Sequence, residues 1–316
     1  MTASDYQGKN VFVTGADGFI GSHVTEELVR RGARVRALVY YNSYGHQGWL
    51  DDVAGDVKAS LEVVTGDVRD ASQMVAHAKG CDVVFHLAAL IAIPYSYTAP
   101  RSYVATNVEG TLNVLEACRA ADVGRLVHTS TSEVFGTARY APIDEAHPRK
   151  AQSPYAATKI GADALVESYH LTYGLPTVIL RPFNTYGPRQ SARAIVPTVI
   201  SQIASDRLVV EVGSTAPTRD LMYVRDTAAA FAAVGLHPGL EGENLNAGTG
   251  VEISIGELIA KIAALMGVAV EVKQSAERLR EKTGWAPSWT LDQGLGETIE
   301  WVRRHLDRYR PEAYTV

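Results

Sequence analysis

Short apolar runs alternate with amphipathic stretches through the first half of the chain. Runs such as NVFVT and DVVFHL predict buried strands at residues 10–14, 34–40, 61–65, 82–87, 125–130 and 176–180. Helical periodicity follows between them, at 18–31 (with Ile20, Val24, Leu28 and Val29 on one face), 103–120 and 154–173. Strands that alternate with helices predict an α/β fold built on a parallel, doubly wound sheet.

The pattern changes after Arg181. Segments such as RPFNTYGPRQ and EVGSTAPTRD are interrupted by Gly and Pro, and helical periodicity returns only at 254–266 and 291–306. This change predicts a smaller, irregular C-terminal lobe. Because ligands of doubly wound sheets lie beyond the carboxyl ends of the strands, we expect this lobe to supply substrate contacts.

Composition narrows the possible partners. The 316 residues carry a formal net charge of -5, which argues against a nucleic-acid partner. MTASDYQGKN lacks the apolar core of a signal peptide, and no later segment could span a bilayer, so a cytoplasmic protein is expected. The two cysteines, Cys81 and Cys118, have no metal-ligand spacing, and no metal is predicted.

A glycine-rich turn joins the first strand to the first helix. VTGADGFIGSH has glycines at the spacing G-x-x-G-x-x-G, which lets the backbone approach a pyrophosphate at the start of a helix. The strand before it and the helix after it favour a dinucleotide site of the Rossmann type over a plain turn. Cofactor contacts are therefore predicted at Gly15, Asp17, Gly18, Phe19, Ile20 and Gly21.

The choice of dinucleotide depends on the second strand. That strand ends LVYYNS, without the carboxylate that often binds the adenosine ribose, and Arg36 lies inside the strand. Asp67, followed by Val68, comes after the third strand and either accepts a hydrogen bond from the adenine amino group or caps a helix. We expect NAD as the cofactor and leave NADP open.

Two segments carry candidate chemistry. Tyr155 and Lys159 in SPYAATK share one helical face, where the ammonium favours the phenolate and the phenolate can take a proton from a sugar hydroxyl. HTSTSEVFG follows the fifth strand and offers the hydroxyls of Thr131 and Ser132 and the carboxylate of Glu133 for general acid/base work. The alternatives are hydroxyls that cap the next turn and a solvated loop carboxylate.

These motifs together resemble the extended short-chain dehydrogenase/reductases that act on nucleotide sugars, the NAD-dependent epimerase/dehydratase group. TGADGFIG, HLAA, NVEGTLNVLEA, TSTSEVFG, YAATK, RPFNTYGPR and TRDLMYVRD occur in the order of that family. VRALVYYNSYGHQGWLDD, RPFNTYGPRQSARAIVPT and GVEISIGELI look most like 4,6-dehydratases of the legionaminic-acid pathway type, which act on nucleotide-linked N-acetylglucosamine.

The resemblance implies a role for each matched residue. It implies oxidation by Tyr155, Lys159 and Thr131, and acid/base work by Glu133. It places Leu87, Ala88, Ala89 and Asn107 at the cofactor, and Asn184, Arg193 and Arg219 at the substrate. For Arg219 the alternative is an ion pair with Asp220 or Asp226.

The resemblance also implies an activity and an assembly. The expected enzyme is a 4,6-dehydratase, which oxidises C4, eliminates water across C5 and C6, and returns the hydride to C6. The alternatives are a UDP-glucuronate decarboxylase, a 4-epimerase and, more remotely, a non-catalytic NAD(P)-sensing protein. A homodimer is expected through helices 103–120 and 154–173, whose extra apolar residues are Val104, Leu112, Leu115, Leu165 and Val166.

The domain division follows from the same motifs. We expect an NAD(P)-binding Rossmann domain at 1–180 with about 220–248, and a substrate-binding lobe at 181–219 with 249–316.

Two departures from the family pattern stand out. Phe135 replaces a more usual tyrosine, and QSAERLREKTGWAPSWTL is short before its GW-x-P motif, in a region that helps relatives bind the nucleotide.

Overall fold

The computed structural model describes residues 5–205, 210, 212, 215–267 and 284–309. Its centre is a seven-stranded sheet in the order β3-β2-β1-β4-β5-β6-β9, with every pair parallel. The strands are β1 (Asn10–Thr14), β2 (Arg34–Tyr40), β3 (Glu62–Gly66), β4 (Val83–His86), β5 (Arg125–Thr129), β6 (Thr177–Pro182) and β9 (Asn244–Ala247). The predicted doubly wound parallel sheet is confirmed, and its strand order reverses between β1 and β4, where ligands of such sheets bind.

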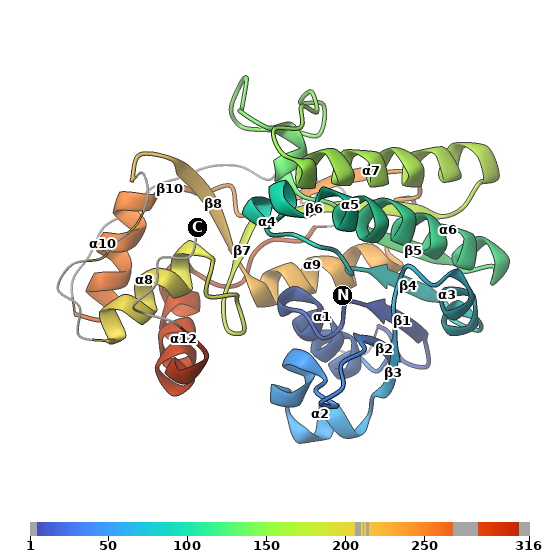
Figure 1. The fold of residues 1–316 in the computed structure, drawn as a ribbon, viewed down its shortest axis with the longest axis horizontal. Coiled ribbons are helices and arrows are strands. Elements are labelled where there is room, and N and C mark those ends of the chain that lie inside the picture. Colours follow the sequence, from blue (N-terminus) through green and yellow to red (C-terminus); the bar gives the residue numbers. More distant parts are fainter. Residues whose placement is uncertain (1–4, 206–209, 211, 213–214, 268–283, 310–316) are drawn as a thin grey trace.

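Helices cover both faces of this sheet (Figure 1). One face packs against α1 (Phe19–Arg30) and α9 (Val224–Leu236), and the other against α3 (Ala71–Ala78), α6 (Gly110–Ala120) and α7 (Pro154–Tyr173). Alternation along β1 shows the division: Val11 and Val13 join the first core, whereas Phe12 joins the second. The sheet is thus covered on both faces, as is usual for parallel sheets.

The connection between β4 and β5 differs from its prediction. The expected helix at 103–120 contains a π-helical segment, η2 (Val104–Glu109), between α5 (Pro100–Tyr103) and α6, and α4 (Ile93–Thr98) precedes it. Single π-helical segments are often found at functional sites. Here the segment carries Asn107 toward the carboxyl end of β4.

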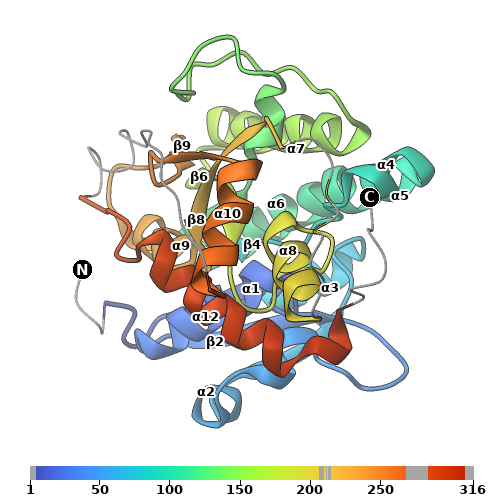
Figure 2. The same ribbon diagram turned by 90° about the vertical axis from the view of Figure 1, so that its left-hand side faces the viewer.

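A second sheet of three strands lies beside the first, in the order β10-β8-β7. It contains β7 (Asn184–Tyr186), β8 (Thr218–Tyr223) and β10 (Glu252–Ser254), covered by α8 (Ile195–Ala204), α10 (Ile255–Leu265) and α12 (Leu291–Arg304) (Figure 2). The helices predicted at 254–266 and 291–306 are found as α10 and α12. Because β8 pairs here while α9 and β9 return to the large sheet, we propose the lobe boundary at Val224 rather than near residue 220.

Remaining short elements are η1 (Gly48–Asp52), α2 (Gly55–Ala59), η3 (Ser132–Phe135) and η4 (Leu306–Arg308). No helix in the described ranges combines the length and the apolar character that a bilayer crossing needs. Within those ranges no group of three or more His, Cys, Asp or Glu is placed to hold a metal ion. The shortened segment before Gly284 falls largely at 268–283, outside the described residues.

The apolar residues predicted for dimerisation divide into two groups. Val104 and Leu112 are 46% and 37% exposed, so they are available to a partner. Leu115 and Val166 are fully buried, and Leu165 packs against the same core. For Leu115 and Val166 the prediction of an outward face is wrong, because they fill the core between α3, α6 and α7, whereas Leu165 is only partly buried.

Candidate active site

The glycine turn after β1 is shaped by close backbone approach. Gly15 has a φ of +69°, and a Cβ there would lie 2.7 Å from the backbone nitrogen of Ala88. A Cβ at Gly21 would overlap the carbonyl oxygen of Gly15. Gly18 begins α1 without a side-chain cap, so the first N–H groups of the helix are free for an anion. The turn therefore fits a pyrophosphate.

Other residues of the turn have different tasks. Phe19 packs edge-on against His23, with ring centroids 6.1 Å apart, and Ile20 packs into the core of the large sheet. Both side chains are partly buried, and the cofactor contacts predicted for these two residues stay predictions. The Asp17 carboxylate accepts a hydrogen bond from the Tyr40 N–H at 3.0 Å, and burial raises the pKa of Asp17. It fastens the turn to the end of β2.

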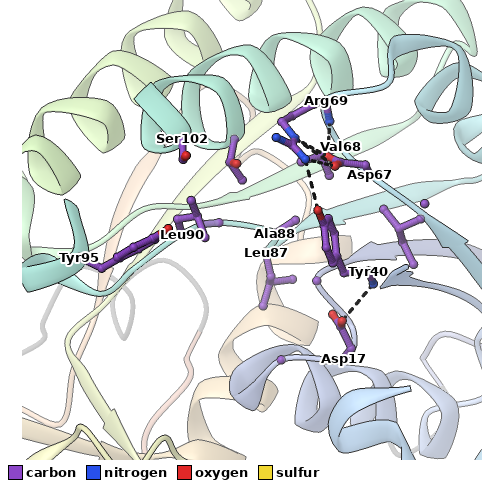
Figure 3. A pocket seen from close by; sticks show the side chains of 16 residues that line it. Asp17, Tyr40, Asp67, Val68, Arg69, Leu87, Ala88, Leu90, Tyr95 and Ser102 are labelled. Carbon is purple, nitrogen blue, oxygen red and sulfur yellow. Dashed lines mark hydrogen bonds and ion pairs between the residues drawn. The ribbon is translucent and has the colours of Figure 1, made fainter. Parts of the chain in front are cut away.

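A cavity of about 470 Å³ opens above this turn (Figure 3). Its walls include Gly15, Gly18 and, from the segment after β4, Leu87, Ala88 and Ala89. Asp67 and Val68 lie toward one end, and Leu90, Tyr95 and Ser102 lie toward the other. The cavity has the size of a small-molecule site and lies at the switch point of the sheet, so these residues fit a bound dinucleotide.

The end of the cavity near β2 holds an ion pair that sequence reasoning missed. Arg69 Nη2 lies 2.5 Å from Asp67 Oδ2 and 3.3 Å from the Tyr40 hydroxyl. Its hydrogen bonds hold the pKa of Asp67 below the usual range. The helix-capping alternative for Asp67 is wrong, because Asp70 caps α3. Arg36 is turned away from this end, toward Glu62 and the carbonyl of His77.

The segment at 87–90 is fixed from two sides. Thr14 Oγ1 accepts the N–H of Ala88 at 3.2 Å. Asn107 Oδ1 accepts the N–H of Leu90 at 2.8 Å, while its Nδ2 donates to Leu90 O at 2.9 Å and to Thr158 Oγ1 at 3.1 Å. Asn107 is 1% exposed, so it is not free to touch the cofactor as predicted. It acts on the site by holding this segment in place.

The acid/base loop follows β5 as η3. Thr131 Oγ1 accepts the N–H of Glu133 at 3.2 Å and caps this short helix. The hydroxyl that caps this turn is thus that of Thr131, and the Ser130 hydroxyl donates to Asp163. Ser132 and Glu133 are partly buried. The acid/base role of Glu133 stays a prediction.

Tyr155 and Lys159 lie on the buried side of α7. Ser153 caps the helix by accepting the N–H of Ala156 at 3.1 Å, which places Tyr155 in the first turn. Tyr155 and Lys159 are 7% and 4% exposed. The Tyr103 ring meets the Tyr155 ring edge-on at 6.3 Å.

Burial dominates the electrostatics of this pair. It raises the pKa of Tyr155, which a hydrogen bond with Thr131 lowers and the charge of Glu133 raises further. The net shift is upward, opposite to the lowering predicted from Lys159, whose charge is not among the main influences on the pKa of Tyr155. Burial also lowers the pKa of Lys159 to about 8, against the opposing charge of Asp163. Thr131, Glu133 and Tyr155 thus act on one another across the loop and the helix.

The predicted substrate residues lie on the smaller sheet and beside it. Asn184 begins β7, next to β8, which carries Arg219. Arg219 is exposed and donates to the carbonyl of its neighbour Thr218 at 2.7 Å. Arg193 is exposed, and its charge acts on Tyr103, which packs against Tyr155.

The alternative of an ion pair for Arg219 is not observed. Asp220 accepts hydrogen bonds from Thr249 and Gly250, whereas Asp226 accepts them from Ser288 and Trp289. Both carboxylates therefore serve as structural acceptors for loops of the chain.

Phe135, where a tyrosine was expected, is 1% exposed. Its ring lies 5.6 Å from the Arg181 guanidinium and meets His147 edge-on at 5.4 Å. The aromatic ring thus packs against a buried cation, and the residue has no access to a substrate hydroxyl.

Comparison with known proteins places this geometry in a family. The family model for GDP-mannose 4,6 dehydratase matches residues 12–283. UDP-glucose 4-epimerase of Mycolicibacterium smegmatis is 35% identical over 310 residues, covering 92% of this chain and 97% of that protein. The dTDP-glucose 4,6-dehydratase of Xanthomonas campestris pv. campestris is 31% identical over 324 residues, covering 92% of each.

A solved structure agrees with these relatives. DesIV, a dTDP-glucose 4,6-dehydratase from Streptomyces venezuelae crystallised with NAD bound, aligns with a TM-score of 0.86 and 29% identity, over 96% of this chain and 100% of that chain. The relatives include both nucleotide-sugar 4,6-dehydratases and epimerases. This chain belongs to the NAD-dependent epimerase/dehydratase family of extended short-chain dehydrogenase/reductases.

Proposed function

We propose that this protein is an NAD-dependent nucleotide-sugar 4,6-dehydratase. The observation that carries the proposal is Glu133, a partly buried carboxylate whose charge acts on Tyr155. A 4-epimerase oxidises and reduces the same carbon and needs no carboxylate for that. Elimination of water from C5 and C6 needs a base for the C5 proton, and Glu133 supplies one.

The first step is oxidation at C4. Tyr155 takes the proton of the C4 hydroxyl, Thr131 hydrogen-bonds to the tyrosine, and Lys159 provides a cation on the same helical face. NAD, when bound, would supply the hydride acceptor for C4 and the hydride donor for C6. Gly15, Gly18 and Ala88 would hold the cofactor along the cavity, and the relative solved with NAD supports NAD over NADP.

The second step is elimination. The C4 ketone acidifies the C5 proton, which Glu133 removes, and the C6–O bond breaks. The protonated Glu133 carboxyl can hand that proton to the departing hydroxyl, which leaves as water. A proton returns to C5 as hydride arrives at C6, and it balances the one that Tyr155 took from the C4 hydroxyl. The product is a 4-keto-6-deoxy sugar.

Residues on and beside the smaller sheet would bind the substrate. Arg219 would grip the diphosphate with its planar guanidinium, and Asn184 and Arg193 would contribute neighbouring contacts. We propose nucleotide-linked N-acetylglucosamine as the first substrate to test. This choice rests on the sequence resemblance of residues 35–52, 181–198 and 250–259 to the legionaminic-acid type of dehydratase.

One alternative has direct support. The 35% identity to a UDP-glucose 4-epimerase exceeds the identity to the dehydratases named above, and an epimerase would use the same Tyr155, Lys159 and Thr131. In that enzyme Glu133 would have no chemical step.

The test is incubation with a panel of UDP-, GDP-, CDP- and dTDP-linked hexoses, including N-acetylglucosamine and glucuronate, followed by mass spectrometry. Loss of one water supports the dehydratase. An unchanged mass with a new epimer on chromatography identifies the epimerase, and loss of carbon dioxide from the uronate identifies the decarboxylase. Binding of NAD without turnover of any sugar would instead indicate the sensing protein.

A further inference from the structure

A buried polar cluster lies directly behind the Tyr155–Lys159 pair, and the proposed chemistry leaves most of it unused. Its members come from β5, β6 and α7, and none is more than 4% exposed: His128, Ser130, Lys159, Asp163 and Arg181. Burying several charges together is costly unless they compensate one another. The arrangement of the cluster shows how they do so.

Asp163 is the carboxylate of the cluster. Its Oδ2 accepts hydrogen bonds from Ser130 Oγ at 2.8 Å and from Arg181 Nη2 at 3.0 Å. Its Oδ1 has no hydrogen-bond partner within the described chain, and it faces His128 Nε2 at 3.5 Å. The same His128 nitrogen lies 3.5 Å from Lys159 Nζ. Asp163 also follows Lys159 by four residues on α7, so the two side chains are neighbours.

We propose that Asp163 is a positioning residue that keeps Lys159 charged and in place beside Tyr155, and that Arg181 limits this effect by sharing the carboxylate. This role rests on the proposed oxidation at C4, in which Lys159 serves as the cation next to the proton acceptor. The carboxylate binds Arg181 directly and reaches Lys159 through its charge, and the balance between these two interactions sets how firmly Lys159 holds its proton.

The other groups around Lys159 do not supply negative charge on its buried side. His86 from β4 and His128 from β5 are neutral, since burial lowers the pKa of His86 well below its ordinary value and that of His128 to about 4. Glu133 acts on Tyr155 from η3. Among the described residues, Tyr103 packs against Tyr155, Arg181 acts on His128 beside Lys159, and Arg149 acts on Asp163 from the other side. Asp163 is therefore the group that opposes the loss of the Lys159 proton.

The sign of the expected pH effect follows directly. Burial lowers the pKa of Lys159 to about 8 and Asp163 raises it, so turnover falls at alkaline pH as Lys159 loses its proton. This fall is the alkaline limb of the plot of turnover against pH. In Asp163→Asn the limb moves to lower pH by about one unit, so turnover at about pH 8 is about fivefold lower than in the wild type. Asp163→Glu keeps the charge and keeps the limb where the wild type has it. Arg181→Gln frees the carboxylate for Lys159 and moves the limb up.

Glu167 offers a matched control on the same helix. It lies one turn beyond Asp163, forms an ion pair with Arg149 and accepts a hydrogen bond from Asn244 at 3.0 Å. Glu167→Gln therefore also removes a carboxylate that an arginine binds, yet it should leave the alkaline limb unchanged. Turnover is followed as whichever product the mass spectrometry identifies, so the test does not depend on dehydration.

Melting temperature against pH gives a second readout that needs no turnover. Because folded Lys159 holds its proton less firmly than the unfolded chain does, stability rises with pH from the folded pKa to about pH 10. In Asp163→Asn this rise begins at a lower pH, even if the variant melts earlier overall. The proposed function could fail in the substrate panel while this shift is still seen.

The outcomes separate the interpretations. Opposite shifts in Asp163→Asn and Arg181→Gln, with Glu167→Gln unchanged, support the role of Asp163. An alkaline limb that is the same in Asp163→Asn, Glu167→Gln and the wild type overturns it. Shifts of Asp163→Asn and Arg181→Gln in the same direction also overturn it, because a purely structural cluster has no reason to give opposite signs.

Discussion

Arg219 gives the sharpest test of the substrate side of the site. The residue is exposed on β8, and the hydrogen bond that its guanidinium makes is to the carbonyl of the adjacent Thr218 at 2.7 Å. The fold therefore makes little use of its charge. If Arg219 holds the diphosphate, Arg219→Ala loses charge-assisted hydrogen bonds worth about 2 kcal/mol, which raises KM about 30-fold. Turnover at saturation should change less, because the ground state and the transition state share the phosphate contact.

Arg225 is the matched control for this substitution. It is another arginine of the same region, but it forms an ion pair with Glu297 at 2.5 Å and lies 5.0 Å over the Trp289 ring. Arg225→Ala should lower the melting temperature and leave KM unchanged, whereas Arg219→Ala should do the opposite. Arg219→Lys restores the charge without the planar fork, so it should recover only part of the binding.

Steady-state kinetics and thermal melts on the three variants show whether Arg219 binds the diphosphate. Unchanged KM in Arg219→Ala would refute the argument and move the search for the diphosphate contact to Arg193. Arg189 is not a candidate, because its guanidinium is buried and forms an ion pair with Glu26 at 2.6 Å. Arg278 lies outside the described residues.

Three further predictions address the chemistry and the assembly. Tyr155→Phe should reduce turnover by at least about 100-fold while calorimetry shows nearly unchanged NAD binding, since the ring still packs against Tyr103; wild-type turnover would contradict the oxidation mechanism. Glu133→Gln should oxidise C4 but not eliminate water, so absorbance of reduced nicotinamide should build up; full product formation would favour the epimerase. The protein should be a homodimer by light scattering at micromolar concentration, and Leu112→Asp, at a side chain 37% exposed, should give monomers; a monomeric wild type counts against this.

The regular part of the fold could be read from the sequence because its signals are local. Strands such as β1 and β6 contain short apolar runs, and α7 has a serine cap, a proline in its first turn and a glycine at its end. The small sheet has no such signal. β7 and β10 contain three residues each, and they exist only because β8 pairs with both of them. Strands that pair although they are far apart in the sequence leave no periodic pattern in such short segments.

The candidate site shows the same difference between local signals and contacts of distant segments. Motifs that lie within one turn or one helix, such as Gly15 to Gly21 and Tyr155 with Lys159, could be located from spacing alone. The contact of Arg69 with Tyr40 could not, because it joins the ends of two strands across the sheet. The signal for Asp163 was present in its spacing from Lys159, but its partner Arg181 comes from β6, and only the fold brings the two together.

Preorganisation of the cavity fits the proposed cycle, in which one cofactor stays bound. The walls at Gly15 and Ala88 approach so closely that only glycine fits, and Thr14 and Asn107 hold the 87–90 segment by hydrogen bonds from β1 and η2. A site already ordered spends little binding energy on fixing its own loops, which strengthens the binding of the ligand. A reaction that returns its hydride within one turnover needs a cofactor that stays bound. Arg219 and Arg193, by contrast, are exposed beside the smaller sheet, as expected for groups that bind a substrate and then release its product.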